Sequence, residues 1–203
     1  EVMANIEKYG NFKPSGKYKQ KTQIILCHTS REVEEYLASL MFRYNSKYDK
    51  IPNYVVTRDG RVLQLLSNEG YGNFFDDVIT NKLSIVVTLE NLGWLEKKPL
   101  TNHYINWKGS IYNEQVYEKK WRDYYFWQPY TSEQIQKTAE LCKHLIDTLQ
   151  IEKTCIGHNT KVDGIENFEG ICSRSNYNST FTDLNPSFNF ETFIKFLENE
   201  QFA

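Results

Sequence analysis

The sequence lacks a strong net charge and a long apolar run. Its 24 Lys and Arg residues face 26 Asp and Glu residues, so no overall basic field exists to hold nucleic acid. No apolar run approaches the ~20 residues that a membrane-spanning helix needs. With 40% hydrophobic and 25% charged residues and no internal repeat, disorder, collagen and coiled coil are excluded. The 203 residues are enough to bury a core of their own.

Cysteine is also scarce. The four cysteines, Cys27, Cys142, Cys155 and Cys172, fit neither a CxxC metal site nor a disulfide framework, which favours a reducing compartment. The chain begins at Glu1 and shows no signal-peptide pattern, so we expect a processed form or part of a longer protein.

The apolar pattern predicts an α/β (α+β) fold with one central sheet and helices that cover it. Residues 1–21 are polar and predict an N-terminal arm, and residues 22–203 predict a single domain. Capping boxes are expected at Thr29 with Glu32 and at Thr131 with Gln134. The expected strands are 23–27, 53–57, 61–66, 83–89 and 154–156, the expected helices 30–44, 132–149 and 190–199, and the expected loops 67–82 and 159–182.

Aromatic residues, by contrast, are abundant, with 14 Tyr, 12 Phe and 4 Trp. Many of them fall within residues 91–130, which we expect to be an insertion of short strands. The aromatic side chains there either form a wall that stacks on sugars or pack the insertion onto its domain.

Two of the four histidines stand where chemistry is expected. His28 and His158 each follow a short apolar strand, and open sheets commonly build their sites at strand ends. Zinc accepts imidazole, thiolate and carboxylate ligands. Because neighbouring side chains on a strand face opposite ways, only one of Cys27 and His28 is expected to hold such an ion. The candidates for a third ligand, from the loop before the last helix, are Asp163, Glu169, Cys172 and Asp183.

Several short blocks follow one another in a recognisable order. They are an apolar strand ending in Cys-His-Thr-Ser (24–30), a hairpin with an Arg-Asp-Gly turn (53–62), a central strand (84–91), a Tyr-Thr-x-x-Gln helix start (130–134), Ile-Gly-His (156–158) and a Thr-Asp segment (182–190). This order resembles the type-2 N-acetylmuramoyl-L-alanine amidases, which share a fold with the peptidoglycan recognition proteins and phage endolysins.

The resemblance implies a central mixed sheet flanked by helices, and zinc-assisted hydrolysis of the bond between N-acetylmuramic acid and L-alanine. The expected partner is peptidoglycan or a muropeptide, with one Zn²⁺ as cofactor. The first zinc position falls on Cys27, with His28 one place later, and the second and third fall on His158 and Asp183. The substrate contacts that we expect are Tyr54, Trp94 and Arg174.

The departures from the family pattern matter as much. The central-strand glutamate of part of the family falls on Thr88, and Glu90, the second catalytic candidate, lies two residues along on the same side. The alternative candidates for the base are Asp163, Glu166 and Glu169 in the long loop. Two further supporting positions fall on Pro52 and Phe181. The alternative function is therefore a degenerate module that binds peptidoglycan or serves as a virion component among other virion or cell-envelope proteins. Arg174 either binds a peptide carboxylate or anchors its own loop.

Overall fold

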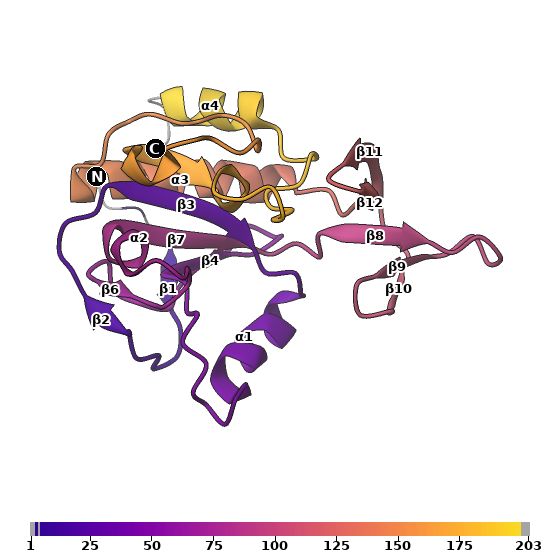
Figure 1. The fold of residues 1–203 in the computed structure, drawn as a ribbon, viewed down its shortest axis with the longest axis horizontal. Coiled ribbons are helices and arrows are strands. Elements are labelled where there is room, and N and C mark those ends of the chain that lie inside the picture. Colours follow the sequence, from indigo (N-terminus) through magenta and orange to yellow (C-terminus); the bar gives the residue numbers. More distant parts are fainter. Residues whose placement is uncertain (1–2, 4, 200–203) are drawn as a thin grey trace.

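A six-stranded mixed sheet forms the centre of the molecule (Figure 1). The structure is a computed structural model, and it describes residue 3 and residues 5–199. The strand order is β1-β5-β4-β7-β3-β13, and only the β4–β5 pair is antiparallel. The strands are β1 (Ile6–Lys8), β3 (Gln23–His28), β4 (Tyr54–Val56), β5 (Val62–Gln64), β7 (Ser84–Leu89) and β13 (Gly170–Ser173). This arrangement confirms the predicted fold class.

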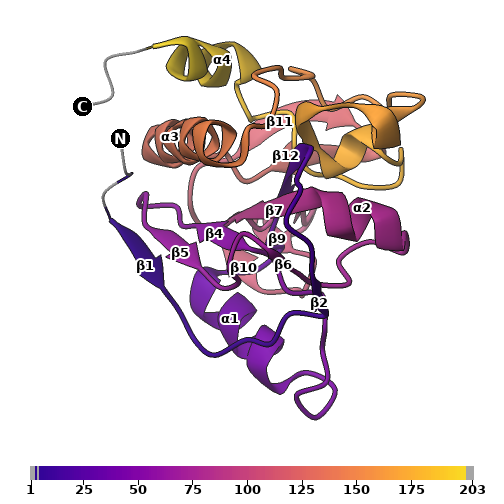
Figure 2. The same ribbon diagram turned by 90° about the vertical axis from the view of Figure 1, so that its left-hand side faces the viewer.

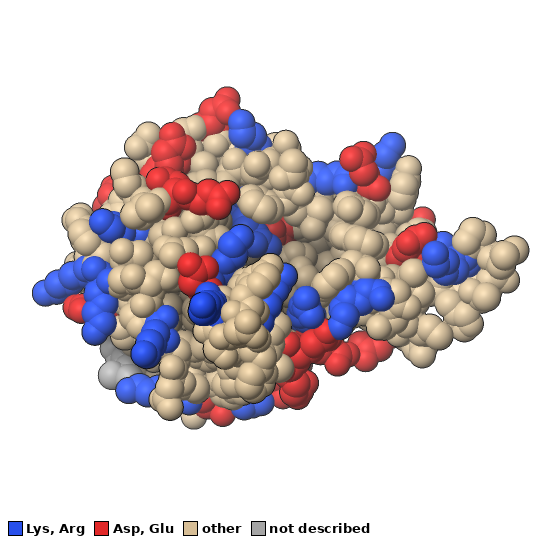
Figure 3. All heavy atoms as spheres, turned by 60° about the horizontal axis from the view of Figure 1, so that its bottom comes forward, with Lys and Arg blue, Asp and Glu red and all other residues tan. Residues whose placement is uncertain are grey.

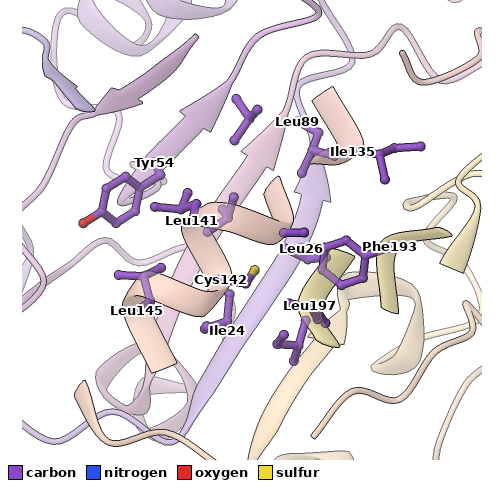
Figure 4. Close-up of a cluster of buried hydrophobic side chains, with 14 of the residues drawn as sticks. Ile24, Leu26, Tyr54, Leu89, Ile135, Leu141, Cys142, Leu145, Phe193 and Leu197 are labelled. Atoms are coloured by element: carbon purple, nitrogen blue, oxygen red, sulfur yellow. The ribbon is translucent and has the colours of Figure 1, made fainter. Parts of the chain in front are cut away.

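Helices cover both faces of this sheet, which is why β3 and β7 are buried along their whole length. In Figure 2, α3 (Ser132–Leu149) and α4 (Phe190–Glu198) lie on one side of the sheet and α1 (Val33–Phe42) lies on the other. Ile24 and Leu26 of β3 pack into the cluster below α3 and α4 (Figure 4). A second cluster lies under α1.

Helix α3 begins as predicted. The Thr131 hydroxyl accepts a hydrogen bond from the Gln134 backbone N–H at 3.1 Å. The Gln134 side chain does not complete the predicted capping box. It is fully buried and donates to the backbone carbonyls of Val56 at 3.0 Å and Glu90 at 2.9 Å. Gln134 therefore ties α3 to the ends of β4 and β7.

The capping box predicted for α1 is wrong. The Thr29 hydroxyl donates to the Arg31 carbonyl, and Glu32 caps the helix with no side-chain hydrogen bond. The Glu90 carboxylate supplies the cap from a distant strand, because it accepts from the Val33 N–H at 2.7 Å. The N-terminus of α1 is therefore capped by Glu90 from a distant strand, and not by a neighbouring residue as the sequence predicted.

Several short elements lie in segments that we expected to be loops or an arm. Strand β2 (Gly16–Lys17) lies in the expected arm and pairs with β6 (Gly70–Tyr71), which lies in the loop expected at 67–82. Most of α2 (Val78–Leu83) lies in the same expected loop. The loop expected at 159–182 contains β13 and two 3-10 helices, η1 (Ile165–Asn167) and η2 (Arg174–Asn176). The strand expected at 154–156 is reduced to one bridge between Cys155 and Ile171. These elements are too short to leave a periodic signal.

The expected insertion is a five-stranded antiparallel sheet that projects from the main body (Figure 1). Its strands are β8 (Trp94–Lys97), β9 (Tyr104–Asn106), β10 (Ile111–Tyr112), β11 (Tyr117–Trp121) and β12 (Tyr124–Trp127). Trp127 is fully buried and its indole N–H donates to the Lys119 carbonyl at 2.8 Å. Part of the aromatic cluster therefore packs the insertion itself.

The described residues contain no helix with the length and apolar character needed to span a membrane.

Truncating Leu141 tests the packing of α3 on the sheet. Leu141 is fully buried, so Leu141→Ala is expected to lower the free energy of unfolding by about 2–5 kcal/mol in a urea titration. Thr148→Ala on the exposed side of the same helix is the control and is expected to change it by less than about 0.5 kcal/mol. Equal losses for the two variants would contradict this packing.

Candidate functional site

The site is built where β3 and β7 end side by side. The two strands are parallel and place Cys27 opposite Thr88, so the Cys27 thiol lies 3.2 Å from the Thr88 hydroxyl. Burial raises the pKa of Cys27 to about 12, an effect that Arg174 opposes and Asp183 reinforces. The thiol of the metal-free chain is therefore neutral at ordinary pH.

A buried ion pair lies beside this strand end. Arg174 begins η2, directly after β13, and its Nε donates to Asp183 Oδ1 at 3.1 Å and to Oδ2 at 2.8 Å. Its Nη2 lies 2.8 Å from Oδ2 as well. Asp183 has no exposed surface, and the backbone N–H of His28 also donates to its Oδ2 at 3.1 Å. Both carboxylate oxygens are therefore engaged.

Charge attraction stabilises this pair against burial. Burial would raise the pKa of Asp183, but Arg174 outweighs it, and the backbone N–H of His28 also helps to hold the pKa below its ordinary value. Burial likewise opposes the charge on Arg174, and Asp183 outweighs it and raises the pKa of the guanidinium. Both groups are charged in the folded protein.

His28 is a neutral, nearly enclosed imidazole. The residue is 8% exposed, Nε2 lies 3.1 Å from the Ser30 hydroxyl, and Nδ1 has no hydrogen-bond partner among the described residues. Burial lowers the pKa of His28 to about 4, although the Asp183 carboxylate opposes this shift. A side chain added at Gly93 would clash with the ring, since a Cβ there would lie 2.8 Å from its Cε1.

The His158 side chain makes a local contact. Its ring is exposed, and Nδ1 accepts a local hydrogen bond from the Thr160 N–H at 3.1 Å. The neighbouring Asn159 side chain donates to the Leu184 carbonyl at 3.0 Å, so the two backbone segments do meet.

The residues present do not fit a zinc ion. The described part of the chain holds no group of three or more His, Cys, Asp and Glu side chains that could bind a metal. Asp183 is paired with Arg174, the Cys27 thiol lies against the Thr88 hydroxyl, and His158 is exposed. Asp183, Cys27 and His158 are therefore engaged elsewhere or exposed, and His28 keeps a buried ring nitrogen, Nδ1, that has no hydrogen-bond partner among the described residues.

Two other expected site residues, Tyr54 and Glu90, make hydrogen bonds within the fold. Tyr54 is buried in the core and its hydroxyl donates to Asn68 at 2.6 Å. Glu90 is buried and its carboxylate accepts from the Val33 N–H and, at 2.9 Å, from the Arg58 N–H. It lines a separate cavity of about 290 Å³. Thus Glu90 joins α1 to the hairpin.

Arg174 and Trp94 line a cavity of about 410 Å³, which we call the basic pocket. No Asp or Glu among the described residues lines it. Its basic lining residues are Arg31, Arg43, Lys50 and Arg174, and its aromatic ones are Tyr36, Tyr48, Phe74, Trp94 and Trp107. Figure 3 shows Lys and Arg side chains gathered near the middle of the face that carries α1.

The insertion supplies one wall of the basic pocket. The Trp107 indole N–H donates to the Ser30 carbonyl at 2.5 Å, and the Arg31 guanidinium lies 5.1 Å from the Trp107 ring centre. Trp94 stacks on Tyr124 with ring centres 4.8 Å apart. Sequence reasoning counted Trp107 only as one of the aromatic residues of the insertion, and it missed Arg31, Arg43 and Lys50, which flank α1.

The comparisons with known proteins agree with this architecture. The family described as N-acetylmuramoyl-L-alanine amidase matches residues 17–167. Among solved structures, the endolysin amidase LysCS from Clostridium intestinale has a TM-score of 0.54 at 10% identity, covering 96% of this chain and 95% of that chain. The hydrolase AmiA from Staphylococcus aureus, in complex with its ligand, has a TM-score of 0.55 at 10% identity, covering 97% and 83%.

A third similar structure is AmpDh3 from Pseudomonas aeruginosa, in complex with anhydromuramic pentapeptide. Its TM-score is 0.52 at 10% identity, with 97% of this chain and 66% of that chain covered. At such low identities these structures show a shared fold alone. Comparison with curated protein sequences gave no significant match.

The match over most of the sequence settles the family. The chain belongs to the N-acetylmuramoyl-L-alanine amidase family, as the resemblance implied. This membership supports a function in peptidoglycan amide hydrolysis at the level of the family.

Breaking the ion pair tests its place in the fold. Asp183→Asn leaves the buried Arg174 without a counter-charge and is expected to lower the free energy of unfolding by about 3–5 kcal/mol. The control is Glu191→Gln, which breaks an exposed ion pair with Lys195 and is expected to leave stability nearly unchanged. Urea unfolding of both variants measures the difference, and similar small effects would disprove the buried pair.

Lowering the pH is expected to destabilise the fold through His28. The pKa of His28 falls from 6.5 to about 4 on folding, so the unfolded chain binds the extra proton between these values. The contribution of His28 is fully present above pH 6.5 and is lost as the pH falls towards 4, by about 3 kcal/mol in all.

Urea unfolding between pH 4 and pH 6.5 measures this loss. His28→Gln is expected to flatten the pH dependence, and the same change at the exposed His103 is expected to keep it. An unchanged slope in His28→Gln would assign the pH dependence to other groups.

Proposed function

We propose that the chain binds a carboxylate-bearing muropeptide in the basic pocket and does not use zinc to cleave it. The observation that carries this proposal is the lining of the pocket, in which basic and aromatic side chains occur without any acidic one among the described residues. A muropeptide joins a sugar to a short peptide with free carboxylates, so it offers groups for both kinds of side chain.

The chemistry of the lining supports such a ligand. Guanidinium groups bind carboxylates through two parallel hydrogen bonds, and Arg43 lines the pocket beside Lys50 without an ion pair among the described residues. Of the other two arginines, Arg31 pairs with Glu35 at 3.0 Å and Arg174 pairs with Asp183. The Trp94 and Trp107 rings offer apolar faces for a sugar or a peptide side chain. AmpDh3, which shares the fold, is known in complex with anhydromuramic pentapeptide.

The second candidate function is zinc-dependent hydrolysis of the N-acetylmuramoyl-L-alanine bond. Family membership favours it, and Cys27 or His28, His158 and Asp183 occupy the positions that the resemblance assigns to ligands. Thr88 and Glu90 are the residues proposed there for charge stabilisation and proton transfer. The engagement of Asp183 by Arg174 argues against this candidate. A role as a phage lysin or virion component draws support only from the resemblance to endolysins such as LysCS.

Calorimetry and a cleavage assay separate the two candidates. The protein is titrated with an N-acetylmuramoyl pentapeptide, and is also incubated with it, with and without added Zn²⁺. We expect saturable binding and no release of a peptide with a free L-alanine amine. Zinc-stimulated release of that peptide would establish the second candidate, and absence of any binding would refute the first.

Removing one charge from the basic pocket is expected to weaken binding. Arg43→Gln keeps much of the side-chain length but loses the charge, so the Kd for the muropeptide is expected to rise about tenfold. The control is Arg61→Gln, because Arg61 lies outside the basic pocket and pairs with Glu7 at the surface. If both variants bind as the wild type does, the ligand does not occupy this pocket.

A further inference from the structure

The guanidinium of Arg174 is held on three sides. Asp183 engages its Nε and Nη2, and the rings of Phe74 and Phe181 lie 5.6 and 4.9 Å from its carbon Cζ. The Arg174 side chain is only 20% exposed. Its position is therefore fixed by an ion pair and by two aromatic contacts.

This cation lies against the carboxylate that the family pattern assigns to zinc. Zinc would need an Asp183 oxygen at about 2.0–2.2 Å. Arg174 already donates to both of these oxygens, and the His28 N–H donates to one of them. A divalent ion there would also face a guanidinium at close range, and like charges repel strongly away from water.

We propose that Arg174 is the resident cation of this site in place of a metal, and that its free Nη1 receives the carboxylate of the ligand. Nη1 has no hydrogen-bond partner among the described residues, and Arg174 lines the basic pocket. One guanidinium thus neutralises Asp183 inside the fold and offers donors towards the pocket. The ligand half of this proposal rests on the proposed function, whereas the metal half stands without it.

The metal half is tested with Zn²⁺ alone. The wild type is titrated with Zn²⁺ by calorimetry, and its melting temperature is measured with Zn²⁺ and with EDTA. We expect an unchanged melting temperature in both cases. Binding of one Zn²⁺ per chain that Asp183→Asn abolishes would overturn the proposal, whereas Zn²⁺ binding that survives Asp183→Asn lies elsewhere and agrees with it.

A double variant separates the ion pair from a general loss of packing. Arg174→Gln leaves Asp183 buried and unpaired, so its melting temperature is expected to fall. Adding Asp183→Asn to Arg174→Gln removes the remaining buried charge and is expected to restore part of the loss. A double variant that is no more stable than Arg174→Gln would show that Arg174 does not serve as the counter-charge.

The ligand half uses Arg174→Lys, which keeps the charge but lacks the planar fork of the guanidinium. Binding of an N-acetylmuramoyl pentapeptide is compared with binding of its C-terminal amide. The wild type is expected to prefer the carboxylate form, and Arg174→Lys to reduce that preference about tenfold. An unchanged preference would overturn the ligand half. Absence of binding to either form in the wild type would overturn the proposed function and this half together, and the Zn²⁺ titration would still decide the metal half.

Discussion

A carboxylate with no exposed surface needs a positive partner, and for Asp183 that partner is Arg174. The pair joins η2 to the segment before α4, and the His28 N–H links the same carboxylate to the end of β3. The Asp183 carboxylate therefore holds together three segments of the chain: the end of β3, η2 and the segment before α4. The position of the strand end, and with it the wall of the basic pocket, depends on this contact.

The same contact determines which chemistry the site can perform. With Asp183 engaged by Arg174 and the Cys27 thiol against the Thr88 hydroxyl, the strand ends present one fixed cation. That combination suits the recognition of an anionic group better than the activation of a water molecule. The amidase fold is retained, and we infer that its pocket binds a ligand without cleaving it.

Local sequence signals predicted the elements that depend on local physics. The buried strands β3 and β7, the hairpin around Gly60 and helix α3 follow from apolar runs, turn chemistry and an N-cap. Strand β13 was missed because its four residues owe their extended form to pairing with β3. The cap on α1 was misassigned because Glu90 reaches it from another strand.

In the candidate site, too, individual residues could be predicted from the sequence, whereas their long-range contacts could not. Asp183 and Arg174 were each singled out, one as a ligand and one as a carboxylate binder or loop anchor. Their pairing was not foreseen, because the two are brought together by the backbone path after β13, which carries no periodic pattern. Trp94, which was proposed to contact substrate, lines the basic pocket. The position of Trp107 in the same pocket could not be predicted, because it depends on how the insertion folds against Ser30.

The most direct measurement is anomalous X-ray scattering at the zinc edge from crystals grown with Zn²⁺. If Arg174 is the resident cation, the map will show no zinc peak beside Asp183 and will show the guanidinium in contact with that carboxylate. A peak at about 2.0–2.2 Å from an Asp183 oxygen, with Arg174 displaced, would contradict the account.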